Sequence, residues 1–76
     1  MAKRNVQLTA LIEREDGGYA SLCPELDIAS QGSTIEEART NLIEALELFF
    51  ETAGPDEVDR RLHGELYVTR VEVEVG

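Results

Sequence analysis

The chain has 76 residues and carries 7 Lys and Arg against 16 Asp and Glu, a formal net charge of −9. This length holds one small domain, and the charge excludes recognition of nucleic acid through a basic surface, which needs clustered Lys and Arg. Since 42% of the residues are hydrophobic, the composition is that of a globular domain, and its acidity would attract a basic partner.

The sequence carries no pattern typical of export or membrane insertion. The single cysteine, Cys23, cannot form an internal disulfide, which suits a reducing cytoplasm. The basic start at Lys3 and Arg4 is not followed by the apolar segment of a signal peptide. No apolar run approaches the roughly 20 residues that span a bilayer. We therefore expect a soluble, cytoplasmic protein that does not associate with membranes.

Apolar and polar residues alternate over positions 5–14, which predicts a half-buried strand. Leu11 is an apolar residue on the polar side of this strand. The core-facing side chains would be Val6, Leu8, Ala10 and Ile12.

Two turns should divide the next segment into strands. Asp16 is followed by Gly17 and Gly18, and Asp-Gly and Gly-Gly are strong hairpin signals because Gly reaches positive φ at little cost. The returning strand would cover residues 19–23 and end at Pro24, which has no N–H for the ladder. A third strand would follow over residues 26–31.

The segment after Gly32 has the features of a helix start. Thr34 as N-cap places Glu37 three residues on, which is the spacing of a capping box. Ser33 with Glu36 offers the same spacing one residue earlier, so the sequence leaves both caps open. The acidic side chains also favour the positive end of the helix dipole.

Apolar residues recur at helical spacing up to the Gly54-Pro55 pair, which signals the end of the helix. Ile43 and Phe50 lie together beside the main stripe and widen the apolar face. The main stripe consists of Ile35, Ala38, Leu42, Ala45, Leu46, Phe49 and Ala53.

Residues 56–64 form a charged connector with room for one helical turn, and residues 65–75 are the predicted last strand. In that strand Val71, Val73 and Val75 alternate with glutamates. The element order β-β-β-α-β predicts an α+β fold in which one helix packs on an antiparallel-rich sheet, as a single domain over residues 1–76.

One helix covers only one face of such a sheet, so the other face must be polar or covered by another copy. Leu11, Ile43 and Phe50 are the apolar residues left over, and we take them as candidates for an oligomer interface. The expected assembly is a homo-oligomer, a dimer or a dimer of dimers.

The sequence offers little for catalysis or metal binding. His63 is the only histidine and Cys23 the only cysteine, so no cluster of metal ligands or nucleophile–base pair can be assembled from them. The glycines are too sparse for a phosphate-binding loop. We expect a binding protein without cofactor or metal rather than an enzyme.

Several short motifs occur together in an order that resembles the HicB-like antitoxin family over roughly residues 5–53. They are Glu15-Asp16-Gly17-Gly18-Tyr19, Cys23-Pro24-Glu25-Leu26, Gln31-Gly32-Ser33-Thr34-Ile35-Glu36-Glu37-Ala38 and Asn41-Leu42-Ile43-Glu44-Ala45-Leu46-Glu47-Leu48. One position departs from the family pattern, because Asp27-Ile28 stands where many members carry Pro-Gly.

The resemblance implies a partial ribonuclease H fold and the antitoxin role of a toxin–antitoxin pair. The family's partner is a small basic HicA-type toxin that cleaves mRNA with a catalytic histidine, and the antitoxin masks its active site. Members typically form dimers or tetramers, and many add a C-terminal DNA-binding domain. This chain ends at Gly76 directly after the predicted last strand, so we expect that domain to be missing and no direct binding of nucleic acid.

The resemblance implies a set of structural residues, and the most acidic loops supply the residues proposed for toxin contact. Gly17, Gly18, Pro24, Gly32 and Thr34 would shape the turns and the helix entry. The acidic loops are proposed to contact the toxin; the alternative is that they only keep the chain soluble. The alternative function for the whole chain is a stand-alone oligomeric scaffold or small-ligand-binding module. A nuclease is suggested by the fold name alone. The proposed toxin contacts are Glu15, Asp16, Glu25 and Asp27.

Overall fold

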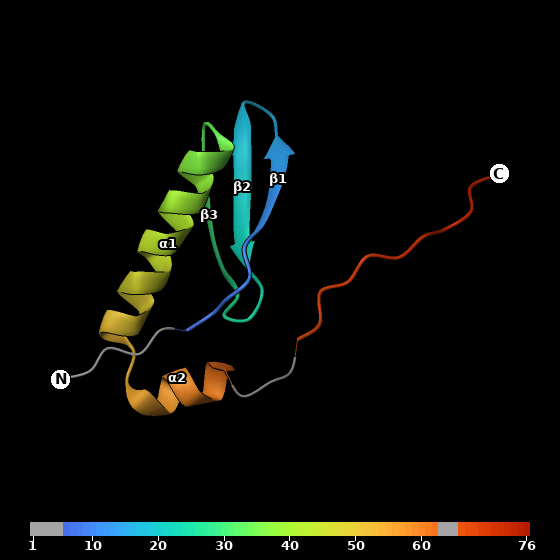
Figure 1. The fold of residues 1–76 in the computed structure, drawn as a ribbon. Coiled ribbons are helices and arrows are strands. Elements are labelled where there is room, and N and C mark those ends of the chain that lie inside the picture. The colour runs from blue at the N-terminus through green and yellow to red at the C-terminus, as the bar shows by residue number, and fades with distance from the viewer. Residues whose placement is uncertain (1–5, 63–65) are drawn as a thin grey trace.

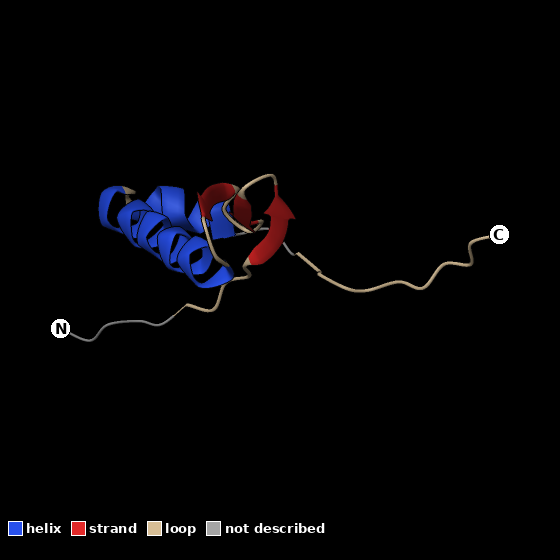
Figure 2. Ribbon diagram, turned by 90° about the horizontal axis from the view of Figure 1, so that it is seen from above, coloured by secondary structure: helices blue, strands red, loops and turns tan. Residues whose placement is uncertain are grey.

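A computed structural model describes residues 6–62 and 66–76. The sheet has three antiparallel strands in the order β1-β2-β3, and α1 packs along one of its faces (Figures 1 and 2). This confirms the α+β class and the β-β-β-α order. The elements are β1 (Leu11–Glu15), β2 (Gly18–Cys23), β3 (Ile28–Gly32), α1 (Ile35–Thr52) and α2 (Pro55–Leu62).

The predicted hairpin is formed by β1 and β2. Leu11 pairs with Leu22 and Glu15 with Gly18, so the turn consists of Asp16 and Gly17. Gly17 has a φ of 78°, a left-handed conformation that glycine adopts without the strain of a Cβ atom. Asp16 and Gly17 therefore form the turn that the sequence predicts.

The second turn, residues 24–27, links β2 to β3. The Leu26 N–H donates to the Cys23 carbonyl at 3.3 Å, and Asp27 has a φ of 55°. Asp tolerates the left-handed region better than most residues, so Asp27 can hold this conformation and close the turn. The third strand starts at Ile28, two residues later than predicted, because Leu26 and Asp27 complete this turn.

The first strand is shorter than the alternation predicts. The prediction covered residues 5–14, of which Asn5 lies outside the described residues, whereas β1 starts at Leu11. Upstream, the Thr9 N–H donates to the carboxylate of Glu25 instead of to a neighbouring strand. Leu8 still packs against the core, as its place in the pattern indicates.

The start of α1 agrees with the prediction and resolves the choice of cap. The Thr34 hydroxyl accepts a hydrogen bond from the Glu37 N–H at 3.0 Å. The Glu37 carboxylate accepts from the Ser33 N–H at 2.6 Å, one residue before the N–H that a standard capping box would use. The helix ends at Thr52, with Ala53 as C-cap.

The segment after Gly54 forms a second helix of eight residues, longer than the single turn that the sequence predicts. Pro55 starts α2, where its missing N–H costs nothing. Arg61 holds this helix to the body, because its Nη1 donates to the Leu26 carbonyl at 2.7 Å and its guanidinium lies 5.5 Å from the Phe49 ring centroid. The connector is thus two turns of helix rather than one.

The predicted last strand is not formed. Residues 66–76 belong to no strand or helix and run away from the sheet as an extended segment, here called the arm (Figure 1). His63 and Glu65, the first residue of that prediction, lie outside the described residues. A strand exists only through its ladder of hydrogen bonds, and Figure 1 shows residues 66–76 apart from the strands that the structure describes.

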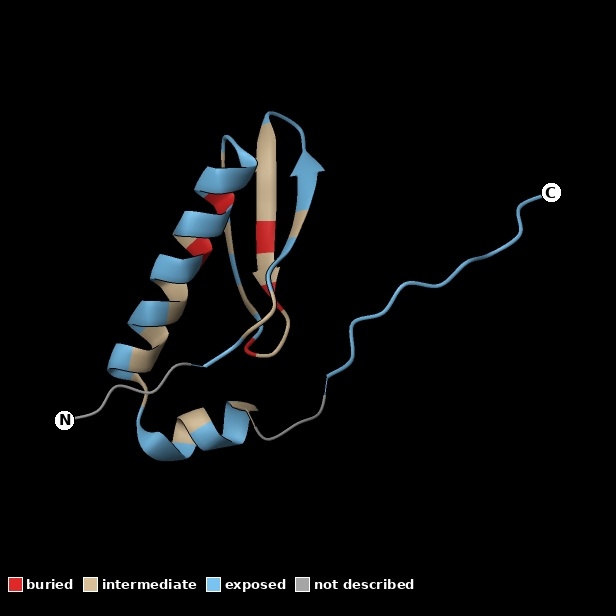
Figure 3. Ribbon diagram, viewed as in Figure 1, coloured by how far each residue is buried: buried red, intermediate tan, exposed pale blue. Residues whose placement is uncertain are grey.

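The core lies between α1, β2 and the second turn (Figure 3). Ser21 is also buried, and its hydroxyl donates to the Ala38 carbonyl at 2.9 Å, which joins β2 directly to α1. Among the described residues no helix is long and apolar enough to cross a membrane. The fully buried apolar residues are Cys23, Leu26, Ala38 and Leu42.

Candidate functional site

The structure divides the acidic candidates into two pairs at opposite ends of β2. Glu15 and Asp16 lie at the turn before β2, and Glu25 and Asp27 at the turn after it. Six residues of strand separate the two turns, which corresponds to about 17–20 Å. A single contact patch made by all four carboxylates is therefore not present in one copy of the chain.

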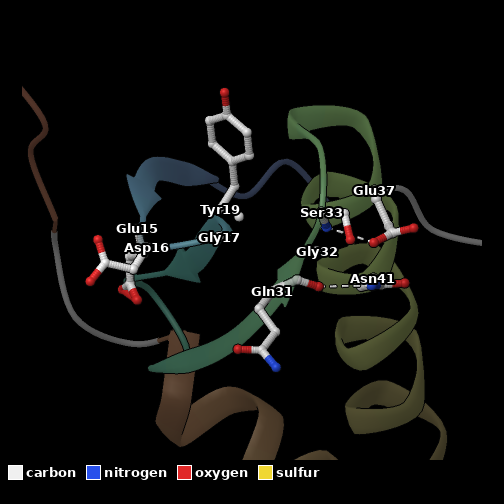
Figure 4. Close-up of a pocket in the computed structure, with 10 residues that line it drawn as sticks. Glu15, Asp16, Gly17, Tyr19, Gln31, Gly32, Ser33, Glu37 and Asn41 are labelled. Carbon is white, nitrogen blue, oxygen red and sulfur yellow. Dashed lines mark hydrogen bonds between the residues drawn. The ribbon is translucent and has the colours of Figure 1, made fainter.

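The first pair lies at a pocket of about 480 Å³ between the hairpin and the start of α1 (Figure 4). Glu15 and Asp16 lie on the hairpin side of this pocket, whereas Glu37 and Asn41 lie on the helix side. Its lining residues are Glu15, Asp16, Gly17, Gly18, Tyr19, Gln31, Gly32, Ser33, Glu37 and Asn41.

Two close backbone contacts bring the hairpin and the helix start together. A Cβ added to Gly18 would lie 2.6 Å from the Gly32 carbonyl oxygen. A Cβ added to Gly32 would lie 2.5 Å from the Ala38 nitrogen and 2.7 Å from the Glu37 carbonyl carbon. Both distances are far below van der Waals contact, so these two glycines set the spacing on which the pocket depends.

The helix side of the pocket is held by hydrogen bonds. Asn41 Nδ2 donates to the Gln31 carbonyl of β3 at 2.8 Å, and Glu37 is fixed by its bond from the Ser33 N–H. The carboxylates of Glu15 and Asp16 are exposed. The pocket therefore combines a hydrogen-bonded rim with three exposed carboxylates, those of Glu15, Asp16 and Glu37.

The residues that line this pocket carry a net negative charge. Three of the ten lining residues are carboxylic acids, and none is Lys or Arg. Arg14 is close, but its guanidinium stacks over the Tyr19 ring at 5.7 Å from the centroid. We call this surface, made by Glu15, Asp16 and Glu37, the acidic end.

Glu25, at the other end, is a structural residue. Its carboxylate accepts hydrogen bonds from Thr9 N at 3.0 Å, from Thr9 Oγ1 at 2.7 Å and from Cys23 Sγ at 3.4 Å. Partial burial acts to raise the pKa of Glu25, but bonds from the Thr9 hydroxyl, the Glu25 and Thr9 N–H groups and the Cys23 thiol outweigh it and lower that pKa overall. The carboxylate thus anchors residue 9 to the second turn.

Cys23 lies in the same cluster and is completely buried. Burial raises the pKa of its thiol, and the neighbouring Glu25 carboxylate acts in the same direction, against N–H bonds from Leu26 and Glu25 that lower it. A buried thiol held in its neutral form is a poor nucleophile.

The three interface candidates do not form one surface. Leu11 is 41% exposed and pairs with Leu22, on the face of the sheet opposite to the one on which Ser21 meets α1. Ile43 is 38% exposed on α1, whereas Phe50 is half-buried against the core. Leu48, 59% exposed on α1, was not among the predictions because it lies outside the stripe.

Glu37 was predicted only as a capping residue, not as part of a site. The signal that could have found it is topological: in an antiparallel meander the first turn and the end of the third strand lie at the same end of the sheet. The helix start must then lie beside the hairpin turn. Within residues 6–62 and 66–76, no three His, Cys, Asp or Glu side chains are placed to hold a metal ion.

Two curated proteins of Synechocystis sp. are similar to this chain. The UPF0150 protein ssr1765 is 48% identical over 52 residues, 66% of this chain and 66% of its own length. The UPF0150 protein ssl0738 is 51% identical over 47 residues, 59% of this chain and 65% of its own length. The chain thus spans slightly less than two thirds of these relatives, whose names state no activity. No family model and no solved structure matches the chain.

Proposed function

We propose that this chain, a homologue of the UPF0150 proteins, is a cytoplasmic HicB-like antitoxin that binds a small basic HicA-type mRNA-cleaving toxin and neutralises it. The observation that supports this most is the acidic end, with three carboxylic acids and no Lys or Arg among the residues that line its pocket. Binding is the proposed activity, without catalysis, cofactor or direct contact with nucleic acid.

Charge provides the physical basis of the proposal. A ribonuclease holds RNA phosphates with clustered Lys and Arg, and a net charge of −9 complements such a surface. Complementary charge raises the association rate and fixes the orientation of the partner. An antitoxin that covers those basic groups would keep RNA away from the toxin.

The rigidity of the acidic end adds to this. Glu37 is held by the Ser33 N–H and Asn41 by the Gln31 carbonyl, and the backbone is close-packed where Gly18 meets Gly32 and where Gly32 meets the start of α1. A surface that is already ordered loses little conformational entropy when a partner binds.

The experiment measures the affinity of this chain for the small basic protein encoded beside it. In the double variant Glu15→Gln/Asp16→Asn we expect the dissociation constant to rise at least tenfold, about 1.4 kcal/mol, through a slower association rate. The matched control, Glu47→Gln/Glu51→Gln, removes the same charge from exposed positions towards the other end of α1 and should change affinity much less.

Binding should also weaken as salt is added, because screening shortens the reach of exposed charges. Equal losses in the two double variants would contradict the acidic end as the contact surface. If no adjacent basic protein exists and no ribonuclease is inhibited, the antitoxin role is wrong. The second candidate, a stand-alone oligomeric scaffold, is favoured by one observation, the exposed valines of the arm.

A further inference from the structure

The arm has the composition of a strand but no neighbouring strand. Val71, Val73 and Val75 are 81%, 74% and 86% exposed, and they alternate with Glu72 and Glu74. β-branched residues with a period of two are typical of a strand packed on one side. So much exposed apolar surface on an extended segment indicates that the arm pairs with something outside its own fold.

The sheet offers one open edge for such pairing. β1 and β3 are the outer strands, but α1 lies against β3, where the Asn41 side chain donates a hydrogen bond to the Gln31 carbonyl. Figure 1 shows no part of residues 6–62 or 66–76 along the outer edge of β1, and an edge strand presents a row of unpaired N–H and C=O groups. Its five residues, Leu11–Glu15, match the length of the alternating segment 71–75.

The arm and the open edge lie on the same side of the molecule. Figures 1 and 2 both show the arm leaving on the β1 side, away from α1. Its root follows α2, which Arg61 holds to the second turn. A twofold axis beside β1 would therefore place each arm along the β1 edge of the other copy in a single operation, as an isologous interface requires.

The extended arm gives the molecule more surface than a compact domain of its size, and that surplus is large enough for an interface with a second copy. The chain exposes 6667 Å², whereas a compact monomer of 8.4 kDa exposes about 4600 Å². Its radius of gyration is 14.9 Å, against about 11.4 Å for a compact domain of this length. The surplus area, about 2000 Å², exceeds the roughly 800 Å² that each partner buries in a standard interface.

We propose that the arm adds as a fourth strand to the β1 edge of a second copy of this chain, and that the second copy's arm does the same in return. The predicted last strand thus exists in the dimer, not in the single chain. This exchange makes the strand pairing depend on assembly. It does not rest on the proposed antitoxin role.

The first experiment measures solution mass at micromolar concentration. The wild type should have an even multiple of the 8.4 kDa chain mass. Val73→Pro removes an N–H from the ladder and should raise the dissociation constant at least tenfold with an unchanged helical circular dichroism signal. The control Val73→Thr keeps a β-branched residue with its N–H and should assemble as the wild type does. A monomeric wild type would overturn the proposal.

The second experiment identifies which copy the arm contacts. A tagged Glu13→Cys chain is mixed with an untagged Val73→Cys chain and treated with a thiol reagent that spans about 10 Å, two strand spacings. We expect a covalent tagged–untagged pair, and none when Glu44→Cys, on exposed α1, replaces Glu13→Cys. A cross-link confined to single chains of a Glu13→Cys/Val73→Cys variant would mean that the arm returns to its own β1, which overturns the exchange.

Discussion

Gly32 decides how closely α1 approaches the sheet. Any side chain at this position would push against the Ala38 nitrogen and the Glu37 carbonyl carbon, backbone atoms that cannot rotate away. We expect Gly32→Ala to lower the free energy of unfolding by about 1–3 kcal/mol, the usual cost of overpacking, as measured by urea titration. Gly54→Ala is the control, since a Cβ there meets nothing within 4 Å, and should change stability by less than about 0.5 kcal/mol. Equal effects would contradict the close approach.

Glu25 should make the free energy of unfolding depend on pH in the acid range. Its pKa is lower in the folded chain than the ordinary value, so its carboxylate stabilises the fold above the unfolded-state pKa of about 4.3. That contribution is lost as the pH falls through the lower, folded pKa. We expect the unfolding free energy of the wild type to decrease in this acid range.

Glu25→Gln tests the source of that dependence. One amide oxygen replaces two carboxylate acceptors, so the variant should be less stable at pH 7 by about 1–3 kcal/mol. Its difference from the wild type should shrink towards pH 3 in urea titrations. Glu44→Gln, the same change at an exposed helical position, should keep the acid dependence of the wild type. A constant difference at every pH would show that the charge of Glu25 is not the cause.

At this scale the sequence indicated the residues with local roles. Gly17 and Thr34 were predicted from patterns only two or three residues long, and both have the predicted role. Glu25 was predicted as an exposed contact, whereas its partner Thr9 lies 16 residues away. Only the folded sheet shows that pairing.

Among the elements, α2 is held to the body by Arg61 and by the packing of Leu62 against the core. Arg61 joins it to the Leu26 carbonyl and the Phe49 ring. We expect Arg61→Ala to lower stability by about 1–2 kcal/mol and to remove the hydrogen-exchange protection of residues 55–62. Arg60→Ala breaks only an exposed ion pair with Glu57, worth at most about 0.5 kcal/mol. Protected α2 amides in Arg61→Ala would show that this anchor is unnecessary.

The elements also show where sequence patterns stop being sufficient. The helix stripe and the two turns depend on near neighbours, and α1, β2 and β3 form within two residues of their predicted ends. The arm has an equally clear period but forms no strand, because a ladder needs a second edge that periodicity does not supply. The acidic end was predicted only in part. Glu15 and Asp16 were identified from the sequence, but Glu37 lies beside them only because the three strands form an antiparallel meander.

For the whole molecule, exchange of arms would link stability to concentration. If folding and dimerisation are coupled, the Tm should rise by about 5 °C for each tenfold increase in protein concentration, given the usual unfolding enthalpy per residue. Differential scanning calorimetry over two decades of concentration measures this. Val73→Pro should show a nearly constant Tm. A Tm of the wild type that does not change with concentration would show that folding is not coupled to dimerisation.

The complete burial of Cys23 makes its thiol a built-in probe of how often the protein opens. As the only thiol, shielded on all sides by the core, it can react with a small alkylating reagent only when the surrounding structure opens. The rate of labelling under native conditions therefore reports how often the body of the protein unfolds, without any introduced probe. A ligand or partner that binds only the folded form would slow that rate in proportion to its occupancy, even if it is bound far from the thiol.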